Sequence, residues 1–85
     1  MEELENLIPS FRAALNGEVS KHRQVNGAGT LAAFVRHVNT HRDRYKTKID
    51  SLRARNIDCD ATQRAINEIA DGYISNARDT GKVDF

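Results

Sequence analysis

The stretch TLAAFVRHVNTHRDRYKTKIDSLRAR, residues 30 to 55, decides the fold of this chain. Its hydrophobic residues recur at spacings of three and four, the pattern of a helix with one buried face. Four of them also repeat every seven residues, as in coiled coils: Leu31, Val38, Tyr45 and Leu52. A helix of about 25 residues spans roughly 37 Å, so we expect an elongated molecule. Thr30 follows the glycine-rich stretch NGAG, residues 26 to 29, and is expected to cap this helix.

Two further helices are predicted on either side of this segment. The N-terminal one has apolar residues at helical spacing: Leu4, Leu7, Ile8, Phe11, Leu15 and Val19. Pro9 interrupts it, so either the helix begins there or it kinks there. The C-terminal one opens with DATQ, in which Asp60 and Gln63 fit a capping box. Its apolar face consists of Ile66, Ile69, Ala70, Tyr73, Ile74 and Ala77.

The predicted fold class is all-α with three helices. Residues 30–55 and 60–79 are expected to form a long antiparallel helical hairpin, with a shorter N-terminal helix packed along it. Ala65, Ala70 and Ala77 would allow the helix axes to approach closely. The 85 residues are expected to form a single small domain, residues 1–85, with 80–85 as a frayed tail. A hydrophobic content of 39%, a charged content of 29% and no Trp suit a soluble helical protein.

The sequence also indicates a compartment. Cys59 is the single cysteine and cannot form an internal disulfide, which favours a reducing environment. No stretch approaches the roughly 18 apolar residues of a membrane span, and the opening MEELENLIPS is acidic. We therefore expect a cytoplasmic protein that does not enter a membrane.

Charge is distributed unevenly along the chain, although the net charge is only +1. Residues 30 to 56 carry a net of +5, whereas residues 57 to 85 carry −3. The basic residues fall on two shoulders of the apolar stripe, one with Arg42, Lys46 and Arg53, the other with Arg44, Lys48 and Arg55. They could pair with acids of neighbouring helices, such as Glu68, Asp71 and the acidic first turn, or bind phosphates. The predicted partner-binding residues are Arg36, Arg42, Arg44, Lys46, Lys48, Arg53 and Arg55.

The stretch HVNTH, residues 37 to 41, places two histidines on one side of the helix. Imidazoles at this spacing can bind zinc or nickel, but two ligands are half of a site. A third ligand could come from His22 or from a carboxylate such as Asp43. Because His41 also falls on the apolar stripe, we favour a buried, hydrogen-bonded histidine, assign no metal ligand and expect no cofactor.

Other candidate chemistry is weak. Cys59 lies between Asp58 and Asp60, which disfavours a reactive thiolate. DCDAT is similar to the start of a calcium-binding loop, but the rest of the pattern is missing. The sixth and twelfth positions of such a loop require Gly and Glu, and here they hold Gln63 and Ile69. NGAG is interpreted as a helix connection. No catalytic residue is assigned, and the protein is not expected to be an enzyme.

Three functional hypotheses follow. The first is a small non-enzymatic helical interaction protein that docks onto a protein partner, regulates or inhibits a larger machine, and self-associates as a homodimer or higher homo-oligomer. The alternative is a nucleic-acid-binding regulator that uses the basic second helix. The third is a metal-binding helical protein that uses His37 and His41.

Overall fold

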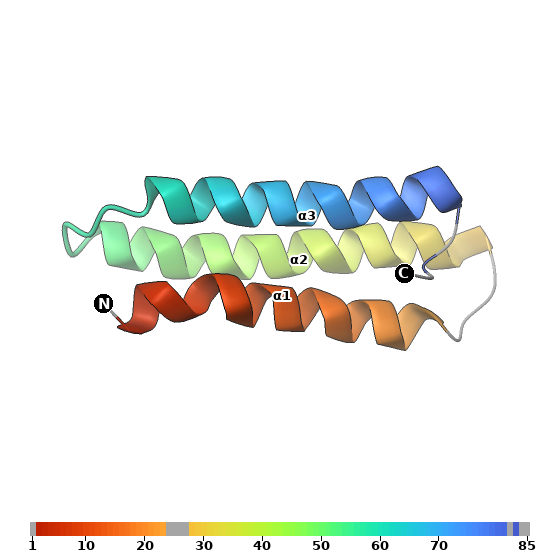
Figure 1. Ribbon diagram of the computed structural model, residues 1–85, viewed down its shortest axis with the longest axis horizontal. Coiled ribbons are helices and arrows are strands. Elements are labelled where there is room, and N and C mark those ends of the chain that lie inside the picture. Colours follow the sequence, from red (N-terminus) through yellow and green to blue (C-terminus); the bar gives the residue numbers. More distant parts are fainter. Residues whose placement is uncertain (1, 24–27, 82, 84–85) are drawn as a thin grey trace.

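In a computed structural model of the protein, the described residues form three helices that pack side by side (Figure 1). The structure describes residues 2–23, 28–81 and 83. The helices are α1, Glu2–Arg23, α2, Ala28–Arg53, and α3, Asp60–Thr80. Each helix contacts both others, and the bundle measures 45 × 17 × 16 Å along its principal axes. The predicted all-α fold with a long α2–α3 hairpin is confirmed, as is the elongated shape.

The start of α1 and the start of α2 differ in detail from the prediction. α1 begins at Glu2 and continues through Pro9 to Arg23, so Pro9 does not start the helix. With 22 residues α1 is shorter than α2 but not shorter than α3, which has 21. α2 begins at Ala28, so Thr30 lies inside the helix and is not its N-cap. Residues 26 and 27 of the predicted connection lie outside the described residues.

α2 ends at Arg53, two residues earlier than expected, because the chain turns into a Schellman motif. The Asn56 amide donates to the Arg53 carbonyl at 2.9 Å, and the Ile57 amide donates to the Leu52 carbonyl at 3.2 Å. Asn56 adopts the left-handed conformation that this motif requires, with φ of 63°. Ile57 packs against the core, which fixes the direction in which the chain leaves the helix.

α3 begins differently from the predicted capping box. Asp60 is the first helical residue, and the N-cap is Cys59, which makes no side-chain capping bond. Instead the Asp58 carboxylate accepts a hydrogen bond from the Asp60 amide at 3.1 Å. The predicted capping box of Asp60 and Gln63 is therefore wrong. The first amide of α3, that of Asp60, instead donates to the side chain of Asp58, two residues upstream.

The core runs along the length of the bundle and matches the predicted apolar faces. α1 contributes one buried face and α2 another, and α3 contributes two isoleucines and two alanines. The buried residues of the helices are Leu7, Phe11, Leu15, Val19, Phe34, Val38, Tyr45, Ile49, Leu52, Ile66, Ala70, Ile74 and Ala77. Val38, Tyr45 and Leu52 of the seven-residue repeat are buried within a single chain, whereas Leu31 is half-buried. Ala70 and Ala77 are fully buried, as helices that pack closely require.

The C-terminal end of α3 closes with a left-handed glycine, Gly81, at φ of 74°. Val83 follows and is buried against the core, with 3% of its surface exposed. This side chain is thus packed, although the segment was expected to fray. Residues 82, 84 and 85 of the predicted tail lie outside the described residues. Among the helices of the described chain, none combines the length and apolar character needed to cross a membrane.

Candidate functional site

Glu18 of α1 lies at the centre of a cluster that contains all three histidines of the chain. His41 of α2 donates from Nε2 to Glu18 Oε1 at 3.0 Å, and His37 donates from Nδ1 to Glu18 Oε2 at 3.1 Å. The Glu18 side chain is only 14% exposed. HVNTH therefore binds one carboxylate through both of its histidines, and this carboxylate joins α2 to α1.

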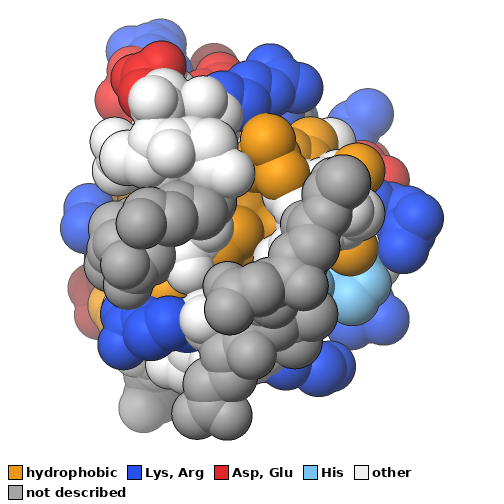
Figure 2. Space-filling model, turned by 90° about the vertical axis from the view of Figure 1, so that its right-hand side faces the viewer, with side chains coloured by type: hydrophobic (Ala, Val, Ile, Leu, Met, Phe, Trp, Pro, Cys, Tyr) orange, Lys and Arg blue, Asp and Glu red, His pale blue; other side chains and the backbone are white. Residues whose placement is uncertain are grey.

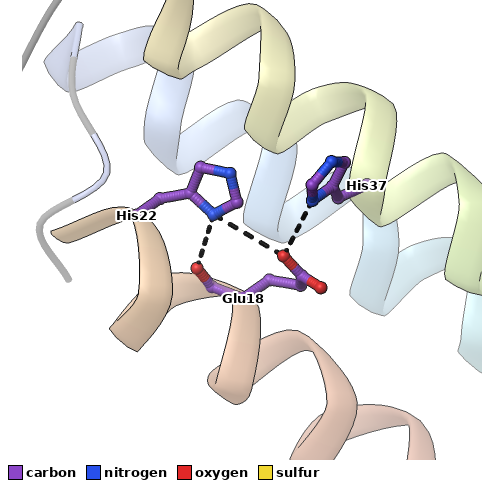
Figure 3. Close-up of side chains that lie close together, drawn as sticks. All are labelled: Glu18, His22 and His37. Atoms are coloured by element: carbon purple, nitrogen blue, oxygen red, sulfur yellow. Dashed lines mark hydrogen bonds and ion pairs between the residues drawn. The ribbon is translucent and has the colours of Figure 1, made fainter. Parts of the chain in front are cut away.

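His22 completes the cluster from the last turn of α1, four residues after Glu18 (Figure 3). Its Nδ1 donates to the Glu18 backbone carbonyl at 2.8 Å and lies 3.6 Å from Glu18 Oε2. The imidazole is 8% exposed and packs edge-on against the ring of Phe34, with centroids 5.7 Å apart. It also contacts the ring of His37, at 5.2 Å. These ring contacts hold His22 with its Nδ1 atom toward Glu18.

The electrostatics of the cluster favour an ionised carboxylate. Burial by itself would raise the pKa of Glu18, but hydrogen bonds from His41 and His37, together with their electrostatic attraction, lower this pKa below its ordinary value. Glu18 is thus a charged, hydrogen-bonded acceptor at neutral pH.

Three atoms that could ligate a metal ion, a carboxylate oxygen of Glu18 and one imidazole nitrogen each of His22 and His37, all lie within 4.8 Å of one another. His41 is not part of this compact group, since it bonds the other carboxylate oxygen. His37 and His41, the two candidate metal ligands in HVNTH, therefore bond different oxygens of Glu18. His22, one of the two suggested third ligands, does join His37, whereas Asp43 lines a different hollow, on α2.

Sequence reasoning missed Glu18. The available signal was the spacing of Glu18 and His22, which are four residues apart and hence on one side of α1. That spacing matches the spacing of His37 and His41, but nothing in the sequence shows that the two pairs face each other.

Three of the seven predicted partner-binding residues make ion pairs within the chain. Arg42 contacts Asp71 at 2.8 Å, Arg53 contacts Asp60 at 2.8 Å, and both pairs join α2 to the α3 side. Arg55 contacts Glu3 of α1 at 3.3 Å. The shoulder with Arg42 and Arg53 thus faces α3, and Arg55 of the other shoulder contacts α1. These exposed pairs contribute little to stability, but they occupy the three guanidinium groups.

The other four predicted residues, Arg36, Arg44, Lys46 and Lys48, make no ion pair within the described part of the chain. The Lys48 amino group lies 4.5 Å from the centre of the Tyr45 ring, a cation–π contact. Lys46 lines a small hollow between α2 and α3. Arg36 and Arg44 line a larger hollow beside Glu18.

Two hollows adjoin on the outer side of α2. The first, called here the basic pocket, has a volume of about 400 Å³ and is lined by Glu18, Lys21, Arg36, His37, Thr40, His41 and Arg44. The second, called here the apolar groove, has a volume of about 700 Å³ and is lined by Leu31, Ala32, Val35, Arg36, Asn39, Thr40, Asp43 and Arg78. Arg36 and Thr40 belong to both hollows, so the two form one continuous surface.

The end of the bundle near the start of α2 is partly hydrophobic at its surface. Figure 2 shows hydrophobic side chains there between Lys and Arg side chains, with a histidine close by. Leu31 and Val35, which line the apolar groove, are only partly covered by the core.

Cys59 lies in the connection between α2 and α3. The thiol is buried and donates to the Ile57 carbonyl at 3.4 Å.

Comparison with protein-family models, with curated proteins and with solved structures finds no match for this chain.

Proposed function

We propose that this protein is a small non-enzymatic helical interaction protein that docks onto an acidic surface of a partner protein. The docking face is the continuous surface formed by the apolar groove and the basic pocket. The observation that carries the proposal is the sharing of Arg36 and Thr40 by an apolar hollow and a basic one.

The composition of this face resembles that of protein interfaces, which combine an apolar centre with a charged rim. Leu31, Ala32 and Val35 supply the apolar part. Lys21, Arg36 and Arg44 in the basic pocket outnumber Glu18 and leave a charge of +2 when the histidines are neutral. A partner with carboxylates beside a hydrophobic side chain would complement both parts.

Arg36 is the expected energetic centre of the face. It is exposed, makes no ion pair among the described residues, and lines both hollows. Arginine is enriched among the residues that dominate binding energies, because its planar guanidinium can bind a carboxylate through two hydrogen bonds.

A protein partner is favoured over nucleic acid because three of the seven basic residues predicted to bind a partner are already paired within the chain. Arg42, Arg53 and Arg55 are paired within the chain, which removes much of the basic helix from phosphate binding. Of the other four, Arg36 and Arg44 line one concave pocket, which suits a carboxylate side chain better than a nucleic-acid backbone, whereas Lys46 and Lys48 lie outside it. Nucleic-acid binding stays the alternative.

Self-association, inhibition or regulation of a larger machine, and a cytoplasmic location are finer parts of this proposal. In self-association, a second copy would cover Leu31 and Val35, because the rest of the seven-residue stripe is already buried within one chain. Light scattering after size-exclusion chromatography measures the mass: a dimer that Val35→Glu dissociates supports this part, and a strict monomer contradicts it.

The docking face is tested by site-specific cross-linking followed by affinity measurement. A photo-reactive residue at Thr40 captures the partner in cell lysate, and the identified protein is then purified. We expect Arg36→Ala to weaken its binding at least 10-fold, which corresponds to more than about 1.4 kcal/mol. Arg64→Ala is the control: Arg64 is exposed on α3 and lines neither hollow, so affinity should change by less than about twofold.

Two results would contradict the proposal. One is a partner that binds Arg36→Ala and the wild-type chain equally well. The other is capture of nucleic acid, with binding that is lost after nuclease treatment and falls steeply as salt increases; this result would favour the alternative.

A further inference from the structure

We propose that Glu18, His22 and His37 form a binding site for one divalent transition-metal ion, with zinc as the best fit. This proposal does not rest on the docking activity, because its evidence is three metal-ligating atoms within the chain, although Glu18 and His37 also line the basic pocket. A carboxylate oxygen and two imidazole nitrogens lie within 4.8 Å of one another, on two different helices.

The two distances from the imidazole nitrogens to the carboxylate oxygen fit a shared metal ion. Zinc bonds nitrogen and oxygen at about 2.0 to 2.1 Å, so the ligand atoms of a tetrahedral site lie roughly 3.3 Å apart. The Nδ1 atoms of His37 and His22 lie 3.1 and 3.6 Å from Glu18 Oε2. Both imidazoles therefore already place one nitrogen close to the same carboxylate oxygen (Figure 3).

A metal ion would replace the protons on the Nδ1 atoms of His22 and His37. Without metal, the Nδ1–H groups of His37 and His22 bond the Glu18 carboxylate and the Glu18 backbone carbonyl. When both histidines carry their proton on Nε2 instead, the two Nδ1 lone pairs become available to the ion. The Glu18 carbonyl then keeps a hydrogen-bond donor, because within α1 it can accept from the backbone amide of His22, four residues later.

Neighbouring side chains support the three ligands. His41 donates to Glu18 Oε1, which orients the carboxylate and leaves Oε2 toward His22 and His37. Phe34, which is fully buried, packs edge-on against His22 and restricts rotation of its ring. Such hydrogen bonds and packing around metal ligands typically strengthen binding 10- to 100-fold.

The donor set selects the kind of metal. Two imidazoles and one carboxylate suit zinc and its neighbours in the first transition row, whereas calcium and magnesium prefer oxygen ligands throughout. Three protein ligands leave a fourth position for water or an exchangeable group. Glu18 and His37 line the basic pocket, so this position would be reached from there.

The ion would cross-link the end of α1 to α2. Because the ligands come together only in the folded chain, metal binding should stabilise the fold. We expect purified protein, stripped with chelator, to bind one zinc ion per chain by calorimetry. The melting temperature should rise by about 10 to 20 °C when free zinc exceeds Kd about 100-fold. Cobalt(II) should give the visible absorption of a tetrahedral site.

Variants decide whether these residues hold the ion. Glu18→Gln and His37→Gln should each weaken zinc binding at least 10-fold, and Glu68→Gln, on the exposed surface of α3, should not change it. His37 is 37% exposed, so His37→Gln should fold normally and decide the question if Glu18→Gln does not fold. The proposal is overturned if the wild-type chain neither retains zinc nor melts higher with it, or if His37→Gln binds zinc as tightly as wild type. None of these measurements involves a protein partner, so their outcome is separate from that of the docking proposal.

Discussion

Replacing Glu18 by alanine should be among the most damaging polar substitutions in this chain, even when no metal is present. The carboxylate is largely buried and accepts hydrogen bonds from His41 and His37 on the neighbouring helix. Its removal leaves a 19% exposed imidazole, His41, facing an apolar stripe without its acceptor. His37 is more exposed and can bond water instead.

The magnitude follows from these contacts. Loss of the acceptor for partly buried His41 costs about 1 to 2 kcal/mol, and loss of the bond from the more exposed His37 costs about 0.5 to 1 kcal/mol. One buried methylene adds about 0.8 kcal/mol, and the higher helix propensity of alanine returns a few tenths. The free energy of unfolding should therefore fall by about 2 to 3.5 kcal/mol, which lowers Tm by roughly 10 to 20 °C for a domain of this size.

Urea unfolding followed by circular dichroism, with chelator present and at neutral pH, measures this change. Glu68→Ala is the matched control, because Glu68 is exposed on α3, and it should change the free energy of unfolding by less than about 0.5 kcal/mol. A loss of less than about 0.5 kcal/mol for Glu18→Ala would refute the reasoning. It would mean that the histidines hold α1 and α2 together without the carboxylate.

Two further predictions concern the backbone. Pro9→Ala should raise the free energy of unfolding by about 1 to 3 kcal/mol, because Pro9 is exposed inside α1 and lacks the backbone N–H group that a helix interior uses for its hydrogen bonds. An unchanged or lower Tm would show that the proline benefits the helix. Asn56→Ala should lose about 1 kcal/mol and Asn56→Gly should equal or exceed wild type, because the residue at φ of 63° ends α2 in a left-handed conformation. The same urea titrations test this, and an alanine variant more stable than the glycine variant would contradict the role of the turn.

The helices and their buried faces were predictable because they depend on local periodicity. Phe11, Val38 and Ile74, for example, are buried where the spacing of three and four places them. The ends of the helices were less predictable, because they depend on hydrogen bonds beyond the repeat. Asp60 has the right chemistry for a cap, yet the amide at the start of α3 is bonded by Asp58.

The candidate site was only half predictable. The pattern HVNTH drew attention to His37 and His41, and the basic residues of α2 were sorted correctly into two shoulders. The sequence suggested pairing with acids such as Asp71, but it could not show that Arg42, Arg53 and Arg55 are the residues that pair. Nor could it show that Arg36 and Arg44 line a pocket. Pairing depends on the rotation and register of one helix against another, and many registers satisfy the same apolar stripe.

The sequence by itself determined that this chain forms three amphipathic helices in an elongated bundle, because burial of a periodic apolar face is a property of each segment taken alone. Only the tertiary structure decided that Glu18 stands opposite HVNTH, that His22 turns toward the same carboxylate, and that an apolar groove adjoins a basic pocket at Arg36. These features join residues from different helices, and side chains that are 19 or 23 positions apart meet only once the helices have packed in one register.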